Sequence, residues 1–285
     1  MQIITGNALE ELQKLPEKCC SVCVTSPPYY RLRNYNIDGQ IGLEETPEEY
    51  IEKLVEVFRE VRRVLKDNGT LWVNIGDSYA GSGKGRNADG SHNNKSSSKE
   101  SFGQKTGKIV KSSIPLNCKA KDLIGIPWLL AFALRADGWY LRQDIIWQKP
   151  NCMPESVRDR CTKSHEYIFL LSKKPRYYFD VEAIKEQAVN TKQRNKRDIW
   201  AVSTANYKAA HFATFPEKLV LPCILAGSKQ GDIVLDPFAG SGTTGAVAIK
   251  NGRDFIGIEI NPDYSKMISQ RLIPLAQQTV NAKIE

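Results

Sequence analysis

The stretch that decides the fold is "VLDPFAGSGTTGAVAIKNGRDFIGIEI", residues 234–260. It begins with an apolar run, passes through a glycine-rich turn into a segment of helical character, and ends in a second apolar run. This order is typical of a strand, a helix and a second, parallel strand in an α/β sheet. Ligands of such sheets bind at the carboxyl ends of the strands, where the glycines allow close approach of the backbone.

Two acidic residues in this stretch narrow the choice of ligand. Glu259 follows Gly240 at about the 20-residue separation at which a carboxylate binds ribose hydroxyls. No lysine follows the glycines, which excludes a phosphate-binding Walker loop. Asp236 would repel the pyrophosphate of a dinucleotide, which disfavours a nicotinamide dehydrogenase, but it suits a cationic amino-acid group. S-adenosylmethionine offers such a group together with a ribose. The alternative is that the glycines only connect strand and helix tightly.

A second unusual turn is "TSPPYY", residues 25–30, which follows the apolar run "SVCV". Proline lacks the N–H that a sheet needs, and a residue before proline adopts extended geometry. The chain therefore leaves a strand abruptly and presents the Ser26 hydroxyl and the Tyr29 ring from a stiff corner. Both turns leave strands at their carboxyl ends, so we expect them to face one crevice.

The remaining patterns extend the same architecture over the whole chain. A strand and a helix are predicted in "MQIITGNALEELQKL", residues 1–15, and a helix from Pro47 to Leu65, before the stop signal "DNG". Strands are predicted in 69–79, 140–149 and 166–173, and a buried helix in 126–139. The predicted fold is a single α/β domain of residues 1–285: a doubly wound, mostly parallel sheet with helices on both faces.

Composition and charge indicate the compartment and the class of partner. The chain has 285 residues, and neither a signal peptide nor an apolar run of about 18 residues is evident, so we expect a cytoplasmic protein without a membrane partner. Residues 81–121 carry nine Lys and Arg against two Asp and Glu, and residues 141–200 carry 13 against eight. Such basic segments favour a polyanion as partner, although solvated lysine-rich loops would give the same counts. We interpret 81–120 as a mobile basic loop and 151–210 as a target-recognition region.

No metal site is expected from the sequence. The pair Cys20 and Cys23 lies on a predicted strand, no second pair matches it, and the three histidines are scattered. We interpret these cysteines as buried thiols. Trp72, Trp128, Trp139 and Trp147 lie in apolar segments and are predicted to belong to the core.

The two turns together resemble those of the amino-methylating DNA methyltransferases. The match consists of "TSPPY" at 25–29, "HFATFPEKL" at 211–219, "DPFAGSGTT" at 236–244 and "GIEINPDY" at 257–264. This resembles the beta-type order of the family, in which the "PPY" motif precedes the cofactor motif. The resemblance implies a Rossmann-like S-adenosylmethionine-dependent methyltransferase fold with a circularly permuted motif order. It places "TGNALEEL" after "GIEI" in the unpermuted fold.

The resemblance also implies roles for individual residues. The catalytic residues would be Ser26, Pro27, Pro28 and Tyr29, which form a pocket for an extruded base: Tyr29 stacks on the base, and the Pro27 carbonyl accepts from its exocyclic amine. The cofactor-binding residues would be Asn7, His211, Phe215, Asp236, Phe238, Gly240, Gly242, Thr243 and Glu259. Asn7 would lie near the adenine of the cofactor, but its local pattern is equally that of a helix cap.

The implied reaction is direct in-line methyl transfer at a short site in double-stranded DNA. No covalent intermediate is expected, because Cys152 follows Asn151 and not a proline. Serine before the prolines favours the N4 amine of cytosine, and the N6 amine of adenine is the alternative. Two different classes of function also remain, a non-catalytic nucleic-acid-binding protein with a vestigial cofactor fold and an enzyme acting on RNA.

DNA contact is expected from the two basic segments. Phosphate contacts give affinity, whereas base edges are read by suitably placed Arg, Asn or Gln. The candidates are Lys84, Arg86, Arg158, Arg160, Arg194, Asn195 and Arg197. Dimerisation is common among such relatives, and a cognate restriction endonuclease is a further partner in many systems of this kind. The residues themselves specify neither a homodimer nor an endonuclease.

Overall fold

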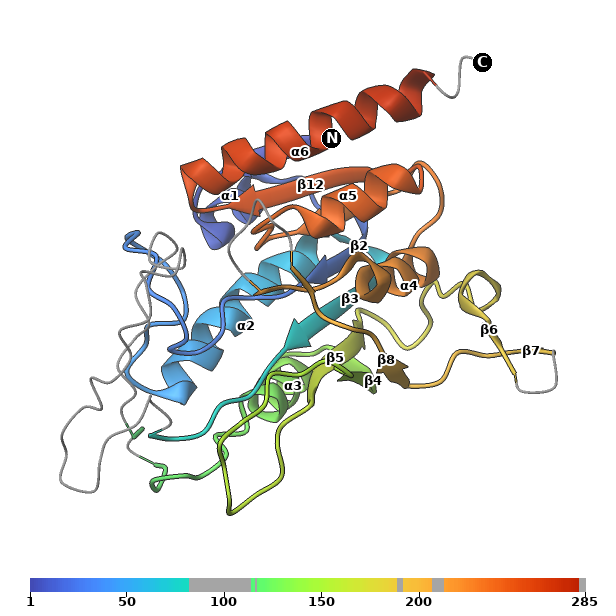
Figure 1. The fold of residues 1–285 in the computed structure, drawn as a ribbon. Helices are drawn as coiled ribbons and strands as arrows, with labels where there is room; N and C mark the ends of the chain where they lie inside the picture. The colour runs from blue at the N-terminus through green and yellow to red at the C-terminus, as the bar shows by residue number, and fades with distance from the viewer. Residues whose placement is uncertain (82–113, 116, 189–191, 207–212, 282–285) are drawn as a thin grey trace.

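The computed structural model describes residues 1–81, 114–115, 117–188, 192–206 and 213–281 (Figure 1). The expected basic loop therefore lies almost wholly outside the described residues. The elements are β1 (Gln2–Thr5), α1 (Ala8–Lys14), β2 (Cys20–Thr25), α2 (Pro47–Val64), β3 (Leu65–Ile75), α3 (Ile126–Ala136), β4 (Tyr140–Gln148), β5 (His165–Ser172), a 3-10 helix (Glu182–Ile184), β6 (Glu186–Gln187), β7 (Gln193–Arg194), β8 (Ile199–Ala201), β9 (Ala205–Asn206), β10 (Ala213–Thr214), α4 (Glu217–Gly227), β11 (Ile233–Asp236), α5 (Thr243–Lys250), β12 (Asp254–Glu259) and α6 (Pro262–Asn281). Within these described ranges, no helix is long and apolar enough to cross a membrane.

The central sheet has eight strands in the order β1-β12-β11-β2-β3-β5-β4-β8. The first five run parallel, β5 runs antiparallel to both of its neighbours, and β4 pairs in parallel with β8. The prediction of a mostly parallel sheet is confirmed. The permuted order is also visible, because β1 from the start of the chain lies beside β12 from its end, with Thr5 opposite Glu259.

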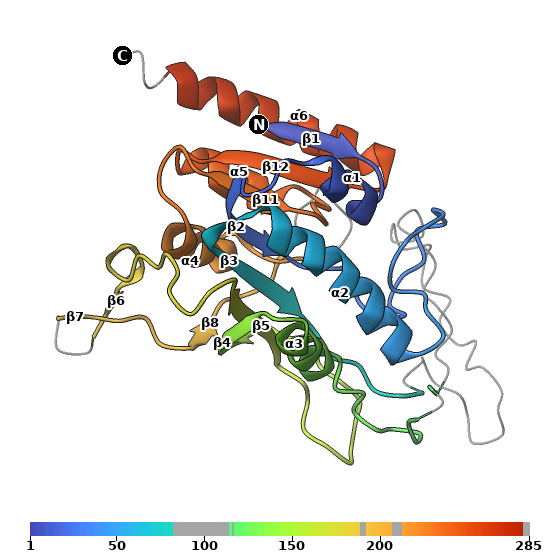
Figure 2. The ribbon, with the colours of Figure 1, turned by 180° about the vertical axis from the view of Figure 1, so that it is seen from behind.

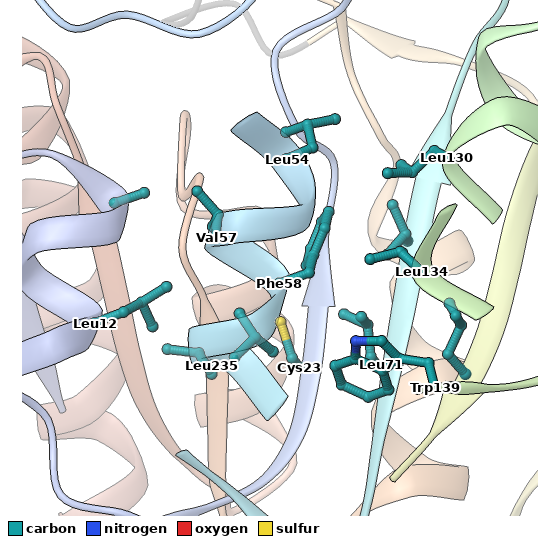
Figure 3. Close-up of a cluster of buried hydrophobic side chains, with 14 of the residues drawn as sticks. Leu12, Cys23, Leu54, Val57, Phe58, Leu71, Leu130, Leu134, Trp139 and Leu235 are labelled. Carbon is teal, nitrogen blue, oxygen red and sulfur yellow. The ribbon is translucent and has the colours of Figure 1, made fainter. Parts of the chain in front are cut away.

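Helices cover both faces of the sheet, which confirms the doubly wound architecture (Figures 1 and 2). Helices α1, α2 and α3 pack on one face and α4, α5 and α6 on the other. Figure 3 shows α2 between its two neighbours, with Leu54, Val57 and Phe58 directed at the sheet. Cys23 of β2 lies in the same cluster. Cys20 and Cys23 are both fully buried, as expected for apolar core thiols.

Helix α2 begins at the residue that the sequence predicts, but it ends one residue before the predicted end. Thr46 caps it and exchanges hydrogen bonds with Glu49 in a capping box, and Pro47 occupies the first turn. The predicted end at Leu65 is wrong. Leu65 instead opens β3 opposite Cys20, because pairing with the buried strand β2 overrides the helical spacing of its side chain.

The region 151–210 is not separate from this sheet. β5 is an interior strand and β8 an edge strand of the sheet, and Ile168, Phe169, Leu170 and Leu171 are buried in the core. Only the segments between these strands extend beyond it. One is the loop 149–164, which joins β4 to β5; another contains the β6–β7 hairpin (Figure 1).

Candidate active site

A cavity of about 670 Å³ opens at the carboxyl edge of the sheet. This volume lies within the range of small-molecule and cofactor sites. Both unusual turns line it: the proline turn with Ser26, Pro27, Pro28 and Tyr29, and the glycine turn with Phe238, Gly240 and Thr243. Chain segments about 200 residues apart therefore share one cleft, as the two turns predict.

The proline corner is fixed by hydrogen bonds from the surrounding structure. Thr25, the last residue of β2, is buried, and the Pro28 carbonyl accepts a hydrogen bond of 2.7 Å from the Tyr50 hydroxyl of α2. The Tyr29 hydroxyl donates to Glu166 Oε2 at 2.6 Å. A Cβ added to Gly76 would lie 2.8 Å from Tyr29 Cε2, so the tyrosine ring lies directly against the backbone that follows β3.

Glu166, at the start of β5, interacts with three donor groups in the cavity wall. Besides Tyr29, Asn74 donates its amide to Oε2 at 3.2 Å, and the Lys149 ammonium forms an ion pair with Oε1. The Lys149 ammonium also lies 4.4 Å from the ring centroid of Trp147. A half-buried charge of this kind is stable only when it is paired and hydrogen-bonded, as it is here. The sequence predicts no site role for Asn74, Lys149 or Glu166, although Asn74 and Lys149 lie in the stretches "GTLWVNIGDSY" and "DIIWQKPN", which also resemble the family.

Tyr29 acts as the donor in this network. Burial raises the pKa of its phenol well above the usual value, and the neighbouring Glu166 carboxylate raises this pKa further. The phenol therefore stays protonated at neutral pH and holds its hydrogen bond to Glu166. The bond fixes the plane of the ring that faces the cavity.

The glycine turn between β11 and α5 lines the same cavity. Gly240 and Gly242 have positive φ angles of 53° and 74°, which favour glycine at both positions. The buried Glu259 carboxylate accepts from the Gly240 N–H at 2.9 Å and from the Asn261 N–H at 2.9 Å. Burial raises the pKa of Glu259 to about 7. Glu259 lines the cavity, whereas Gly242 is not one of the residues that line it.

Asp236 differs from the expectation that it faces the cofactor. It is 1% exposed and does not line the cavity. Its carboxylate accepts from Thr25 Oγ1 at 2.6 Å and from Thr244 Oγ1 at 2.7 Å, and burial raises its pKa to about 6. The side chain thus ties the end of β2 to β11 and α5 and fixes the two turns relative to each other.

Asn7 combines the two roles that its sequence pattern left open. Its Oδ1 caps α1 by accepting from Leu9 N at 2.9 Å and Glu10 N at 3.4 Å, and its side chain lines the cavity. The amide of Asn7 donates to the Gly39 carbonyl at 3.4 Å, in a loop that closes over this end of the cavity. Tyr35 of this loop meets Tyr264 edge to face.

The other candidate residues divide between the cavity and positions away from it. Phe215 lines the cavity, and Trp147, expected only in the core, is both 3% exposed and part of the cavity wall. His211, Lys84 and Arg86 lie outside the described residues.

Arg158 and Arg160 lie on loop 149–164, whose Glu155 and Lys163 reach the cavity. Arg160 pairs with Glu155 at 2.5 Å.

The remaining DNA-contact candidates lie at the other end of the sheet. Arg194 belongs to the β6–β7 hairpin, and Asn195 and Arg197 follow it. Both views show this hairpin beyond the edge opposite the loops that frame the cavity (Figures 1 and 2). Arg194 Nε and Arg197 Nε donate to the same Glu186 oxygen at 3.0 and 3.2 Å. The structure does not bring this cluster to the cavity.

The permuted sheet and the shared cavity are those of a Rossmann-like methyltransferase. Residues 20–270 match the family described as DNA methylase, whose members methylate N6 or N4 amines, and the chain belongs to this family. Membership makes S-adenosylmethionine the methyl donor.

Individual relatives agree with this assignment. The chain is 49% identical over 270 residues to the Type II methyltransferase M.Cfr9I of Citrobacter freundii, covering 95% of this chain and 87% of that protein. It is 50% identical over 275 residues to the Type II methyltransferase M.SmaI of Serratia marcescens, covering 95% and 90%. The solved structure of PvuII DNA methyltransferase (cytosine-N4-specific) superposes with a TM-score of 0.68 at 21% identity, covering 98% and 92%, and so shares the fold.

The residues present fit this cofactor. The positive φ angles of the glycine turn bring backbone close to the cavity. The Glu259 oxygens accept backbone hydrogen bonds from Gly240 and Asn261, and a carboxylate has further lone pairs that can accept from hydroxyls. Asn7, Phe238 and Gly240 would line the adenosine side, and Glu259 would hold the ribose. When bound, the cofactor supplies an electrophilic methyl group on a sulfonium.

Proposed function

We propose that this protein transfers the methyl group of S-adenosylmethionine to the exocyclic N4 amine of cytosine, at a short site in double-stranded DNA. The observation that carries the proposal is the single cavity lined by both the "SPPY" corner and the glycine turn. Serine before the prolines supports cytosine over adenine. The size of the cavity supports an extruded base beside the cofactor, because a base within the duplex cannot reach it.

The chain's own residues contribute mainly positioning. The Tyr29 ring, held by Glu166 and Gly76, stacks on the base. The Pro27 carbonyl accepts a hydrogen bond from the amine, and the Ser26 hydroxyl supplies a second polar contact. These contacts turn the nitrogen lone pair out of conjugation with the ring and toward the methyl group, and such alignment accounts for much of the rate in a two-substrate reaction.

The product base tests this proposal directly. Purified protein is incubated with S-adenosylmethionine and duplex DNA of mixed sequence, and the digested nucleosides are identified by mass spectrometry. N4-methylcytosine is the expected product, and it should be absent with Tyr29→Ala. N6-methyladenine would identify the alternative base. Methylation of RNA but not of DNA would contradict the proposal entirely.

A further inference from the structure

Met153 is unusually exposed for a large apolar side chain at a cavity. It is 82% exposed, more than any other large hydrophobic side chain among the described residues. It also lines the cavity that holds the "SPPY" corner. Single apolar side chains on a surface are ordinary, so the place of Met153 at the cavity, and not its exposure alone, carries the inference.

The backbone that carries Met153 is held in place on both sides. The Lys149 N–H donates to the Ser164 carbonyl at 2.8 Å and so closes the base of loop 149–164. The Asn151 side chain accepts from the Thr204 N–H at 2.9 Å and donates to the Thr204 carbonyl at 3.4 Å. Pro154 follows and fixes its own φ. The exposed side chain is therefore presented from an anchored turn.

The loop around Met153 carries a small net positive charge, with Lys149, Arg160 and Lys163 each paired to a carboxylate. Residues 149–163 carry four basic side chains against two acidic ones, and the loop leaves the same edge of the sheet on which the cavity opens (Figure 1). A positive segment at this position attracts the phosphate backbone. Apolar side chains that enter a duplex are commonly flanked by such phosphate contacts.

We propose that Met153 enters the DNA stack at the place vacated by the extruded base. The inference rests on the proposed function, because only an enzyme that extrudes its target leaves such a gap. An apolar side chain in the gap restores stacking contacts that the flanking bases lose. Methionine suits this position because its flexible, polarisable side chain adapts to irregular apolar surroundings. Met153 is a positioning residue: it stabilises the extruded state and touches neither the cofactor nor the reacting amine.

The test compares single-turnover methylation of two duplexes that differ only opposite the target base. In one duplex the target is normally paired, and in the other it faces an abasic site, which removes the pairing energy that extrusion must overcome. Met153→Ala should lower the rate on the paired duplex by about tenfold or more and leave the rate on the unpaired duplex near that of the wild type. Ile199→Ala is the matched control, since Ile199 is 64% exposed and does not line the cavity. Its rates should be unchanged on both duplexes.

Extrusion can also be measured without methyl transfer. With 2-aminopurine at the target position, the fluorescence gain on binding should be smaller for Met153→Ala than for the wild type. Equal rate losses on both duplexes, or no loss on either, would overturn the proposal. So would a loss confined to the paired duplex in Leu32→Ala and absent in Met153→Ala, because Leu32 is, among the described residues, the other exposed large apolar residue that lines this cavity. If the wild type modifies adenine, the cytosine assignment fails, and the same comparison at that adenine still decides the role of Met153.

Discussion

Substituting Gly76 by alanine would displace the Tyr29 ring without disturbing the backbone. Gly76 has no positive φ, so alanine is compatible with its conformation. The added Cβ would lie 2.8 Å from Tyr29 Cε2 and 3.3 Å from Glu166 Cδ. Ordinary van der Waals contact begins near 3.4 Å, so the ring must move by about 0.6 Å.

A displacement of this size should slow methyl transfer without weakening the cofactor site. A misplacement of about 1 Å at a reacting centre costs about a hundredfold in rate, so we expect kcat to fall by about ten- to hundredfold. The affinity for S-adenosylmethionine should be unchanged, because the added Cβ would contact Tyr29 and Glu166 and neither the glycine turn nor Glu259. Single-turnover methylation and calorimetric titration of the cofactor measure the two quantities separately.

Gly69→Ala is the matched control for this experiment. Gly69 lies within β3, the strand that Gly76 follows, and a Cβ there would lie 3.0 Å from the carbonyl oxygens of Lys66 and Ser21. This variant should lose stability in urea unfolding and keep its single-turnover rate. A wild-type rate for Gly76→Ala would refute the claim that the placement of the Tyr29 ring governs transfer.

Three further predictions concern the carboxylates Glu166, Asp236 and Glu259. Glu166→Gln removes the ion pair with Lys149 and should lower kcat by about tenfold at unchanged cofactor affinity; a loss of affinity alone would contradict the positioning role. Thr25→Val removes the 2.6 Å donor to Asp236 and should lower the free energy of unfolding by about 1–3 kcal/mol in urea titration, whereas an unchanged midpoint would show that this bond contributes nothing. The folded-state pKa of Glu259, about 7, lies above its ordinary 4.5, so the ligand-free protein should lose stability as pH rises through this window, while cofactor affinity should increase as the carboxylate forms. Glu259→Gln should make both profiles flatter, and unchanged slopes would assign them to another group.

Much of the fold follows from local patterns in the sequence. The run of apolar residues in β2 is long enough to indicate a fully buried strand, and the stiff turn after it marks the carboxyl edge. Thr46, Pro47 and Glu49 define the start of α2 because helix caps depend on neighbouring residues only. The end of α2 could not be predicted in the same way. Leu65 fits the helical spacing, and only pairing with a strand 45 residues earlier in the chain decides its conformation.

Some residues of the active site could likewise be predicted from local sequence, and others could not. The proline turn at 25–30 and the glycine turn at 236–244 can each be recognised from their sequence, and both line one cavity in the structure. Glu166 gave no comparable signal because its position follows from the antiparallel pairing of β5 with β3, which places it beside Asn74 and Tyr29. The charge of Asp236 and the resemblance of its turn both predict a ligand contact, but the side chain does not line the cavity. Its carboxylate instead accepts hydrogen bonds from the hydroxyls of Thr25 in β2 and Thr244 in α5. These two residues come together only in the tertiary fold.

The most direct test of the shared cavity is a crystal structure of the protein with a cofactor analogue and duplex DNA containing the target site. The account predicts an extruded cytosine against the Tyr29 ring, with its exocyclic nitrogen within about 3.2 Å of the Pro27 carbonyl oxygen. The analogue should occupy the wall formed by Gly240 and Glu259 on the other side of that nitrogen. A target base bound outside this cavity, or a cofactor analogue that does not face it, would contradict the account.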